Sequence, residues 1–282
     1  FHILIAVLSA LLIYYLVPGD VYPKAPLAAS MIILMAVLWI TEAIPIPVTS
    51  LIPLFYLPFI GVASVKEVSP YYARSIVFLF LGGFLLALAL QRSGIHKRIA
   101  LQIVHKIGSK PARIVLGFMI ATGFLSMWIS NTASVMVMLP VGLSVIHQAK
   151  ASGLSGKDLQ NFGLGIMLGM AYAADIGGMA TVIGTPPNLV FIELFQELFP
   201  EAPEVSFIDW MMMGLPMTFI FMTSGWILLT KIIFRVQKKD AFGGNDTIKS
   251  QLSDLGKLSR DELFAGLIFA FTALLWMTGS DI

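Results

Sequence analysis

Apolar stretches separated by short polar segments make up most of the chain. Six of them predict membrane-spanning helices, at about residues 3–17, 26–41, 46–61, 75–91, 206–230 and 262–279. Their lengths approach the ~20 residues that a helix needs to cross a bilayer. The first stretch has neither the basic start nor the small-residue cleavage site of a signal peptide, so we expect it to be a span. Pro45 and Pro47 predict a tight connection between the second and third spans.

Residues 94–107 have a different pattern. Isoleucine recurs at every fourth position from Ile95 to Ile107, and basic residues occupy the opposite face. This pattern predicts an amphipathic helix that lies on the cytoplasmic membrane surface and serves as a connector. The alternative is a binding site for anionic lipid or for a partner.

Composition excludes several classes of protein. Of the 282 residues, 57% are hydrophobic and 12% are charged. A soluble protein has about 25% charged residues, so an ordinary soluble enzyme and a disordered chain are excluded. The net charge of +2 comes without a large basic patch, which argues against nucleic-acid binding. The chain has no cysteine, which excludes disulfides, thiolate nucleophiles and cysteine-bound metals.

The distribution of Lys and Arg predicts the orientation of the spans. Three segments, 92–113, 147–160 and 231–260, hold 15 of the 18 basic residues, and the order of the spans places all three on one side. Basic residues collect on the cytoplasmic side of membrane proteins. We therefore expect these three segments to be cytoplasmic loops of a multi-pass protein of the cell membrane, with the acidic segment 193–209 outside.

The segment 111–149 contains two apolar runs joined by Ser130-Asn131-Thr132. This uncharged tripeptide suits the start of a helix, because its side chains accept hydrogen bonds from the free N–H groups of the first turn. Two interpretations remain open. The segment is either two full spans with a tight external turn and Trp128 at the interface, or a re-entrant hairpin that turns inside the membrane. Within the membrane, such polar groups are tolerated only where they line a cavity or pack on protein.

Residues 159–199 predict a helix that is interrupted in its middle. Three glycines and two adjacent prolines between residues 175 and 188 disfavour a continuous helix. Thr185 as N-cap, with Pro186 at the first helical position, predicts the start of a second half-helix. A Gly/Pro kink without a ligand is the alternative. An interrupted span is the typical sequence sign of a transporter binding site.

The two features lie at similar depth. Ser130 follows Arg113 by 17 residues and Asp175 follows Asp158 by the same number, roughly 25 Å of helix in each case. The hairpin and the interrupted span therefore bring two helix N-termini and several oxygen atoms toward one point. Helix N-termini favour anions, whereas unpaired carbonyls and side-chain oxygens suit a hard cation such as Na⁺. The pattern predicts an anion site beside a cation site.

At these residues the chain resembles the divalent anion/sodium symporter family. The matching motifs run from Thr41-Glu42 to Thr49, across Ser130-Asn131-Thr132, and across Gly184-Thr185-Pro186-Pro187-Asn188. The order of the elements matches as well: a surface helix, a re-entrant hairpin and then a broken span.

The resemblance implies an all-α integral membrane protein, the N-terminal half of an inverted-repeat elevator-type transporter that works as a homodimer. Residues 1–110 would form scaffold spans and the cytoplasmic surface helix, and residues 111–199 the hairpin and broken span of the transport domain. Residues 200–282 would form the following span, a cytoplasmic loop and the first span of a second repeat, the rest of which lies outside this chain.

The implied function is sodium-coupled secondary transport of di- or tricarboxylates of the succinate, malate and fumarate class. Na⁺ would be the coupling ion, membrane lipid a further partner, and no other cofactor or enzymatic activity is implied. A sodium-independent anion exchanger, or a transporter of sulfate or another oxyanion, is the alternative. An enzyme and a channel are further classes. Ser130 as a nucleophile lacks a suitably spaced base, since His147 lies near the other end of the same helix.

The resemblance also implies roles for individual residues. The anionic substrate would be held by the following residues: Ser130, Asn131, Thr132, Thr185 and Pro186. The ligands of Na⁺ would come from an overlapping set: Ser130, Asn131, Gly184, Thr185 and Asn188.

Asp175 departs from the family pattern, in which we expect a small neutral residue. A carboxylate within the membrane costs a few kcal/mol and is a functional candidate by default. It has three possible partners: a bound cation, a proton, or nearby N–H groups. We favour the N–H groups of Gly177 and Gly178, because Asp commonly accepts bonds from such turns.

Overall fold

The structure, a computed structural model, describes residues 1–20, 22–108, 110–236 and 244–279, and within these ranges it contains helices and no strands. The chain divides into two compact units, Phe1–Phe78 and Leu79–Ile282. This division reflects packing, whereas the expected division into scaffold and transport segments concerns movement and stays a prediction.

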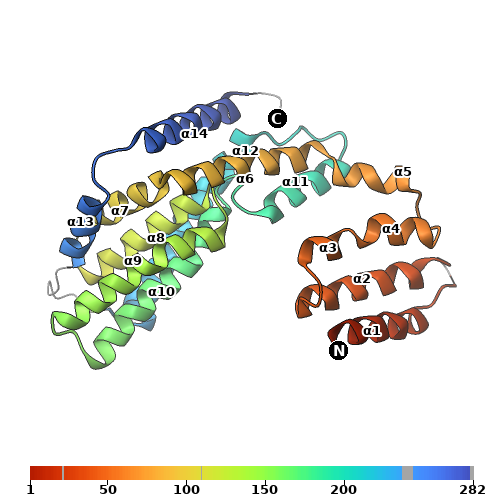
Figure 1. The fold of residues 1–282 in the computed structure, drawn as a ribbon, viewed down its shortest axis with the longest axis horizontal. Helices are drawn as coiled ribbons and strands as arrows, with labels where there is room; N and C mark the ends of the chain where they lie inside the picture. The colour runs from red at the N-terminus through yellow and green to blue at the C-terminus, as the bar shows by residue number, and fades with distance from the viewer. Residues whose placement is uncertain (21, 109, 237–243, 280–282) are drawn as a thin grey trace. The chain divides into compact units, whose positions relative to one another are not determined.

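The first unit is built on a pair of apolar helices. Helix α1 (His2–Leu16) packs along α2 (Ala25–Thr41) (Figure 1), and both coincide with predicted spans. Glu42 then adopts a left-handed conformation with φ 47°, which ends α2. The expected tight connection therefore exists. The unit closes with α5 (Val65–Val68) and a 3-10 turn at Ser69–Tyr72.

The predicted span at 46–61 is wrong as a continuous helix. The structure has two short helices there, α3 (Ile46–Ser50) and α4 (Ile52–Phe59). Pro53, the second residue of α4, has no N–H to donate to the turn before it. The proline therefore interrupts the ladder at Leu51.

The boundary between the units falls inside α6 (Ser75–Ser93), which is followed in the second unit by α7 (Ile95–Ile107). Gly94 separates the two helices, and its φ of +82° is readily available only to glycine. Helix α7 coincides with the predicted amphipathic helix. Ala100, Leu101 and Val104 are fully buried and Ile95 is buried, whereas Ile99, Ile103 and Ile107 are partly exposed. Its location on the membrane surface stays a prediction.

The neighbouring helix determines which face of α7 is buried. Helix α8 (Pro111–Ser126) packs on α7, and Gly117 in α8 has no side chain at the contact. A Cβ atom at Gly117 would lie 3.2 Å from the Val104 Cα atom, so the two backbones approach closely at this point. The approach selects the face of α7 that carries Val104.

Three helices form the centre of the second unit. Helices α8, α9 (Asn131–Ala151) and α10 (Gly156–Gly178) lie side by side (Figure 1) and contact one another. Large apolar side chains fill the space between these helices and α7, among them Leu101, Phe118, Met138, Phe162 and Met170. This packing holds the ends of α8, α9 and α10 in fixed positions.

The remaining helices are α11 (Pro186–Leu198), α12 (Phe207–Ile227), α13 (Gly244–Asp254) and α14 (Arg260–Thr278). Helix α12 continues into a π-helical turn at Leu228–Ile233. Helix α13 lies inside the predicted loop 231–260 and was not predicted; its buried Ile248 packs into the core. Lys238 and Lys239 of that loop lie outside the described residues.

Four helical stretches in the described part of the chain are long and apolar enough to cross a membrane. They are Val65–Ser93, Asn131–Ala151, Phe207–Ile233 and Arg260–Thr278. Helices α1, α2 and α8 are also apolar but shorter. Large apolar side chains such as Phe219 and Ile220 in α12 and Phe271 in α14 are exposed. These features are consistent with an integral membrane protein.

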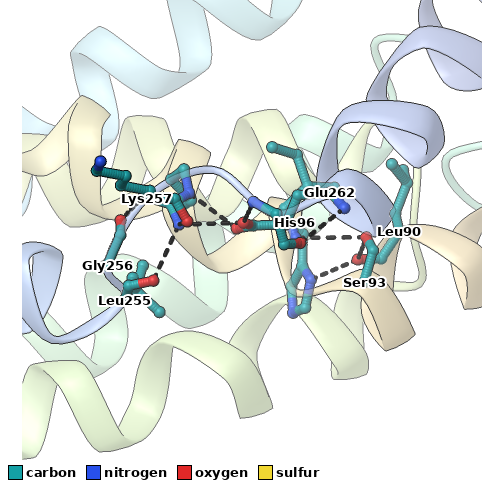
Figure 2. Close-up of polar contacts among 10 residues, drawn as sticks. Leu90, Ser93, His96, Leu255, Gly256, Lys257 and Glu262 are labelled. Carbon is teal, nitrogen blue, oxygen red and sulfur yellow. Dashed lines mark hydrogen bonds and ion pairs between the residues drawn. The ribbon is translucent and has the colours of Figure 1, made fainter.

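A polar cluster joins α7 to the start of α14 (Figure 2). The guanidinium of Arg98 donates to both carboxylate oxygens of Glu262, at 2.8 and 3.1 Å, and to the carbonyl oxygens of Leu255, Gly256 and Lys257. Next to it, Nδ1 of the buried His96 lies 2.8 Å from the Leu90 carbonyl oxygen. Burial lowers the pKa of His96 below its ordinary value.

Candidate functional site

The turn between α8 and α9 carries the first set of predicted site residues. Helix α8 ends at Ser126 and α9 begins at Asn131. The Ser130 hydroxyl oxygen accepts from the Ala133 N–H at 3.3 Å, so Ser130 is the N-cap that the sequence predicts. Ser130 and Thr132 are exposed. We call residues Ser126–Thr132 the hairpin tip.

Asn131 connects the hairpin tip to α10. Its side-chain oxygen accepts from the Ser126 hydroxyl at 2.7 Å, and its side-chain nitrogen donates to Asp175 Oδ1 at 2.8 Å. Asp175 lies in the last turn of α10 and is exposed. The expectation that Asp175 pairs with the N–H groups of Gly177 and Gly178 is therefore wrong. The helix continues through both glycines, and the partner in the structure is Asn131.

The interruption predicted in the helix over residues 159–199 is present in the structure. Helix α10 ends at Gly178 and α11 begins at Pro186, with Thr185 as its N-cap. Thr185 is therefore the N-cap residue that the sequence predicts, but its side chain makes no capping hydrogen bond. We call the segment Met179–Thr185 the break. A continuous kinked helix is excluded.

Asn188 holds the two half-helices together across the break. Its side-chain nitrogen donates to the carbonyl oxygens of Gly178, at 2.9 Å, and Thr181, at 2.8 Å. Asn188 is 7% exposed. Its amide N–H groups therefore point into the protein.

The hairpin tip and the break touch through their backbones. A Cβ atom on Gly184 would lie 2.5 Å from the Gly178 carbonyl oxygen and 3.0 Å from that of Ser126. The hydroxyl of Thr181 also donates to the Met127 carbonyl oxygen. These contacts place the start of α9 and the end of α10 beside one another, as the depth argument predicted.

Helix α12 fixes the α10 end from another side. Trp210 Nε1 donates to the Met179 carbonyl oxygen at 3.0 Å, and the Thr218 hydroxyl donates to that of Ile176 at 3.1 Å. Two carbonyl groups at the end of α10 are thereby satisfied. Because the neighbouring backbone is tied down, the position of Asp175 is set by the surrounding helices.

The predicted residues differ in how accessible they are. Ser130, Thr132 and Pro186 are exposed, Asn131 and Thr185 are partly buried, and Gly184 and Asn188 are buried. The sequence analysis missed Ser126, which binds Asn131 within the hairpin tip, and Thr181, which binds the Met127 carbonyl oxygen from the break. Both are buried hydroxyl residues beside predicted motifs, but a lone Ser or Thr in an apolar stretch gives no signal of its partner.

Comparison with known proteins identifies the family of the chain. A protein-family model described as Citrate transporter matches residues 36–280. The chain belongs to this family. Its membership agrees with the family that the motifs indicated.

Two relatives of this chain have names that state what they transport. The chain is 42% identical over 264 residues to the sodium-dependent dicarboxylate transporter SdcS of Staphylococcus saprophyticus, and 40% identical over 264 residues to SdcS of Staphylococcus aureus. Each alignment covers 93% of this chain and 50% of the relative. The chain therefore spans about half the length of the curated relatives that it matches.

Proposed function

We propose that the chain belongs to a sodium-coupled secondary transporter that carries dicarboxylates of the succinate, malate and fumarate class across the cell membrane. The names of its relatives at 42% and 40% identity support this assignment. The observation that carries it is the contact between the hairpin tip and the break, where Asn131 binds Asp175 and Gly184 lies against Gly178 and Ser126.

The substrate half of the proposed site is the start of α9. The exposed hydroxyl groups of Ser130 and Thr132 lie at the positive end of this helix, which favours a carboxylate. The start of α11 contributes less than the sequence analysis assumed, because Pro186 and Pro187 have no N–H groups to donate. Thr185 and Pro186 then border the substrate rather than bind it through backbone donors.

The sodium half of the proposed site lies between the hairpin tip and the break. Oxygen atoms gather there from the Asn131 side chain and from the backbone of Ser126 and Gly178. Gly184, Thr185 and Asn188 shape this region, and Ser130 borders it. Oxygen ligands of this kind suit a hard cation.

Electrostatics supports coupling between the two halves. A dicarboxylate at the start of α9 would lie near the Asp175 carboxylate, and like charges repel. A cation bound between them offsets this repulsion. Substrate affinity would then depend on Na⁺, and Na⁺ affinity on substrate, by the same factor.

The larger organisation follows from the resemblance. Residues 1–110 would be scaffold and surface helix, residues 111–199 the moving hairpin and broken span, and residues 200–282 the next span, a cytoplasmic loop and the start of a second repeat. The working unit would be an elevator-type homodimer. Its segments 92–113, 147–160 and 231–260 would face the cytoplasm.

The test is uptake by the intact protein reconstituted into liposomes. Radiolabelled succinate should accumulate when Na⁺ is present outside and should not when choline replaces Na⁺. Citrate and sulfate are offered separately to define the substrate class. Equal uptake in choline, with exchange against internal anion, would instead identify a sodium-independent exchanger and overturn the coupling.

A further inference from the structure

The location of Asp175 is not explained by the stability of its own helix. It lies in the last turn of α10, near the negative end of the helix dipole, where a negative charge is unfavourable. The last basic residue before it in α10 is Lys157, in the first turn of the helix. Its side-chain partner in the structure is the amide nitrogen of Asn131, 2.8 Å away in a different helix.

This bond determines which way the Asn131 amide faces. An ionised carboxylate accepts hydrogen bonds and donates none, so Asp175 can face only the amide nitrogen. The Ser126 hydroxyl on the other side can donate or accept, and by itself it would tolerate either orientation. Asp175 is therefore the partner that decides the orientation.

The orientation matters because of where the amide oxygen then points. A Cβ atom built on Gly178 would lie 2.8 Å from Asn131 Oδ1, so the oxygen faces the last residue of α10 at the beginning of the break. If the amide turned over, its N–H₂ group would face this point and would repel a cation. The two orientations thus differ in whether an oxygen ligand is available.

We infer that Asp175 is a positioning residue, which turns the Asn131 oxygen toward the break and so prepares the cation site. This inference rests on the proposed function, which places Na⁺ there. The backbone supports it: Gly177 lies against Gly123, and Gly184 lies against Gly178 and Ser126, so the helices that carry Asp175 and Asn131 have little freedom to separate.

Two other roles for Asp175 make different predictions. If Asp175 is a direct ligand of Na⁺, its negative charge is needed for Na⁺ binding. As an additional cap for α9, it would affect thermal stability and not Na⁺ affinity. Four variants separate the three roles: Asp175→Ala, Asp175→Asn, Asn131→Asp and the exchanged pair Asn131→Asp/Asp175→Asn.

The measurement is the Na⁺ concentration for half-maximal succinate uptake by the intact protein in liposomes. If Asp175 is a positioning residue, Asp175→Ala should raise the half-saturating Na⁺ concentration about tenfold. Asp175→Asn should raise it less, about threefold, because the new amide oxygen still accepts from Asn131. Asn131→Asp should raise it about tenfold or more, since two carboxylates then face each other.

The exchanged pair is the decisive variant. An amide at position 175 would donate to a carboxylate at position 131, which presents an oxygen to the break in either orientation. The half-saturating Na⁺ concentration should return to within about threefold of wild type. Asp254→Ala, which removes an exposed aspartate from α13, is the control and should leave it unchanged.

Four results would overturn the inference. Equal losses in Asp175→Asn and Asp175→Ala, with no recovery in the exchanged pair, would make Asp175 a direct ligand. A lower melting temperature with an unchanged Na⁺ requirement would make it a cap. Absence of sodium-dependent uptake by the wild type would overturn the proposed function together with the inference, whereas normal wild-type uptake with an unaffected Asp175→Ala would overturn the inference alone.

Discussion

Gly177 in α10 lies with its backbone directly against the backbone of Gly123 in α8: a Cβ atom on Gly177 would be only 2.5 Å from the Gly123 Cα atom. The two helices cross here, one turn from the hairpin tip and from Asp175. Small residues at such crossings allow the close backbone approach on which packing in membranes depends.

This contact predicts that Gly177→Ala is strongly destabilising. The added methyl group would force α8 and α10 apart, at a cost of about 1–3 kcal/mol or more. The melting temperature of the purified protein in detergent should fall by several degrees. Gly82→Ala in α6 is the matched control, because a Cβ atom there has nothing within 4 Å. Equal melting temperatures of the Gly177→Ala and Gly82→Ala variants would contradict the prediction that this contact contributes to stability.

Asn188 is predicted to stabilise the break through its amide nitrogen. Asn188→Ala would leave the carbonyl oxygens of Gly178 and Thr181 without this donor, at a cost of about 1–3 kcal/mol. Asn188→Asp should be worse, because a carboxylate cannot donate and would face two carbonyls. Melting temperatures check both variants. Gln102→Ala, an exposed amide in α7, should change nothing; a similar drop there would argue against a specific role.

The paired prolines at the start of α11 are predicted to keep the break open. Replacing Pro186 and Pro187 by Ala supplies N–H groups that can bond the carbonyls before them. The protein should still insert into the membrane, but the half-saturating Na⁺ concentration for uptake should rise several-fold. Pro203→Ala, in the loop after α11, serves as the control. An unchanged half-saturating Na⁺ concentration in the double variant would show that the break does not contribute to cation binding.

Thr132 is predicted to lie on a water-accessible, substrate-sensitive surface. Since the chain has no cysteine, Thr132→Cys introduces a single thiol. It should react with a polar maleimide, and succinate with Na⁺ should slow the reaction. Ser134→Cys, only two residues further, is fully buried and should stay unreactive. Labelling from the extracellular face alone, with no effect of substrate, would favour two full spans over a re-entrant hairpin.

The Arg98–Glu262 pair is predicted to fasten α7 to the start of α14. The side chains are 11% and 7% exposed, so removing one leaves the other largely buried and without its partner. Arg98→Ala should therefore lower stability by about 3–5 kcal/mol, measured as a fall in melting temperature. Arg92→Ala removes an exposed arginine from α6 and should have little effect. If both variants melt at the wild-type temperature, the cluster contributes no stability.

Much of the helical framework follows from local sequence. The spans predicted at 3–17, 26–41, 75–91 and 262–279 correspond to α1, α2, α6 and α14 within a few residues. Ser130 as N-cap and the interruption before Pro186 were predicted for the same reason. Apolar runs, capping side chains and prolines act within a few residues of themselves, so the sequence displays them directly.

The errors come from residues whose role depends on a distant neighbour. The sequence does not indicate which face of α7 packs on α8, because that face is set by Gly117, which lies against Val104. Helix α13 was not predicted because its sequence is polar, and the contacts of Ile248 with the core are what make it a packed element.

By itself, the sequence determined a set of apolar helices, consistent with an integral membrane protein, with an uncharged Ser-Asn-Thr turn and an interrupted helix, and its motifs indicated the family. Only the tertiary structure decided that Asn131 binds Asp175, 44 residues away, and that Asn188 turns inward to hold Gly178 and Thr181. An amide or a carboxylate can bond many partners, and the partner is chosen by which helix ends the packing of α8, α9 and α10 brings together.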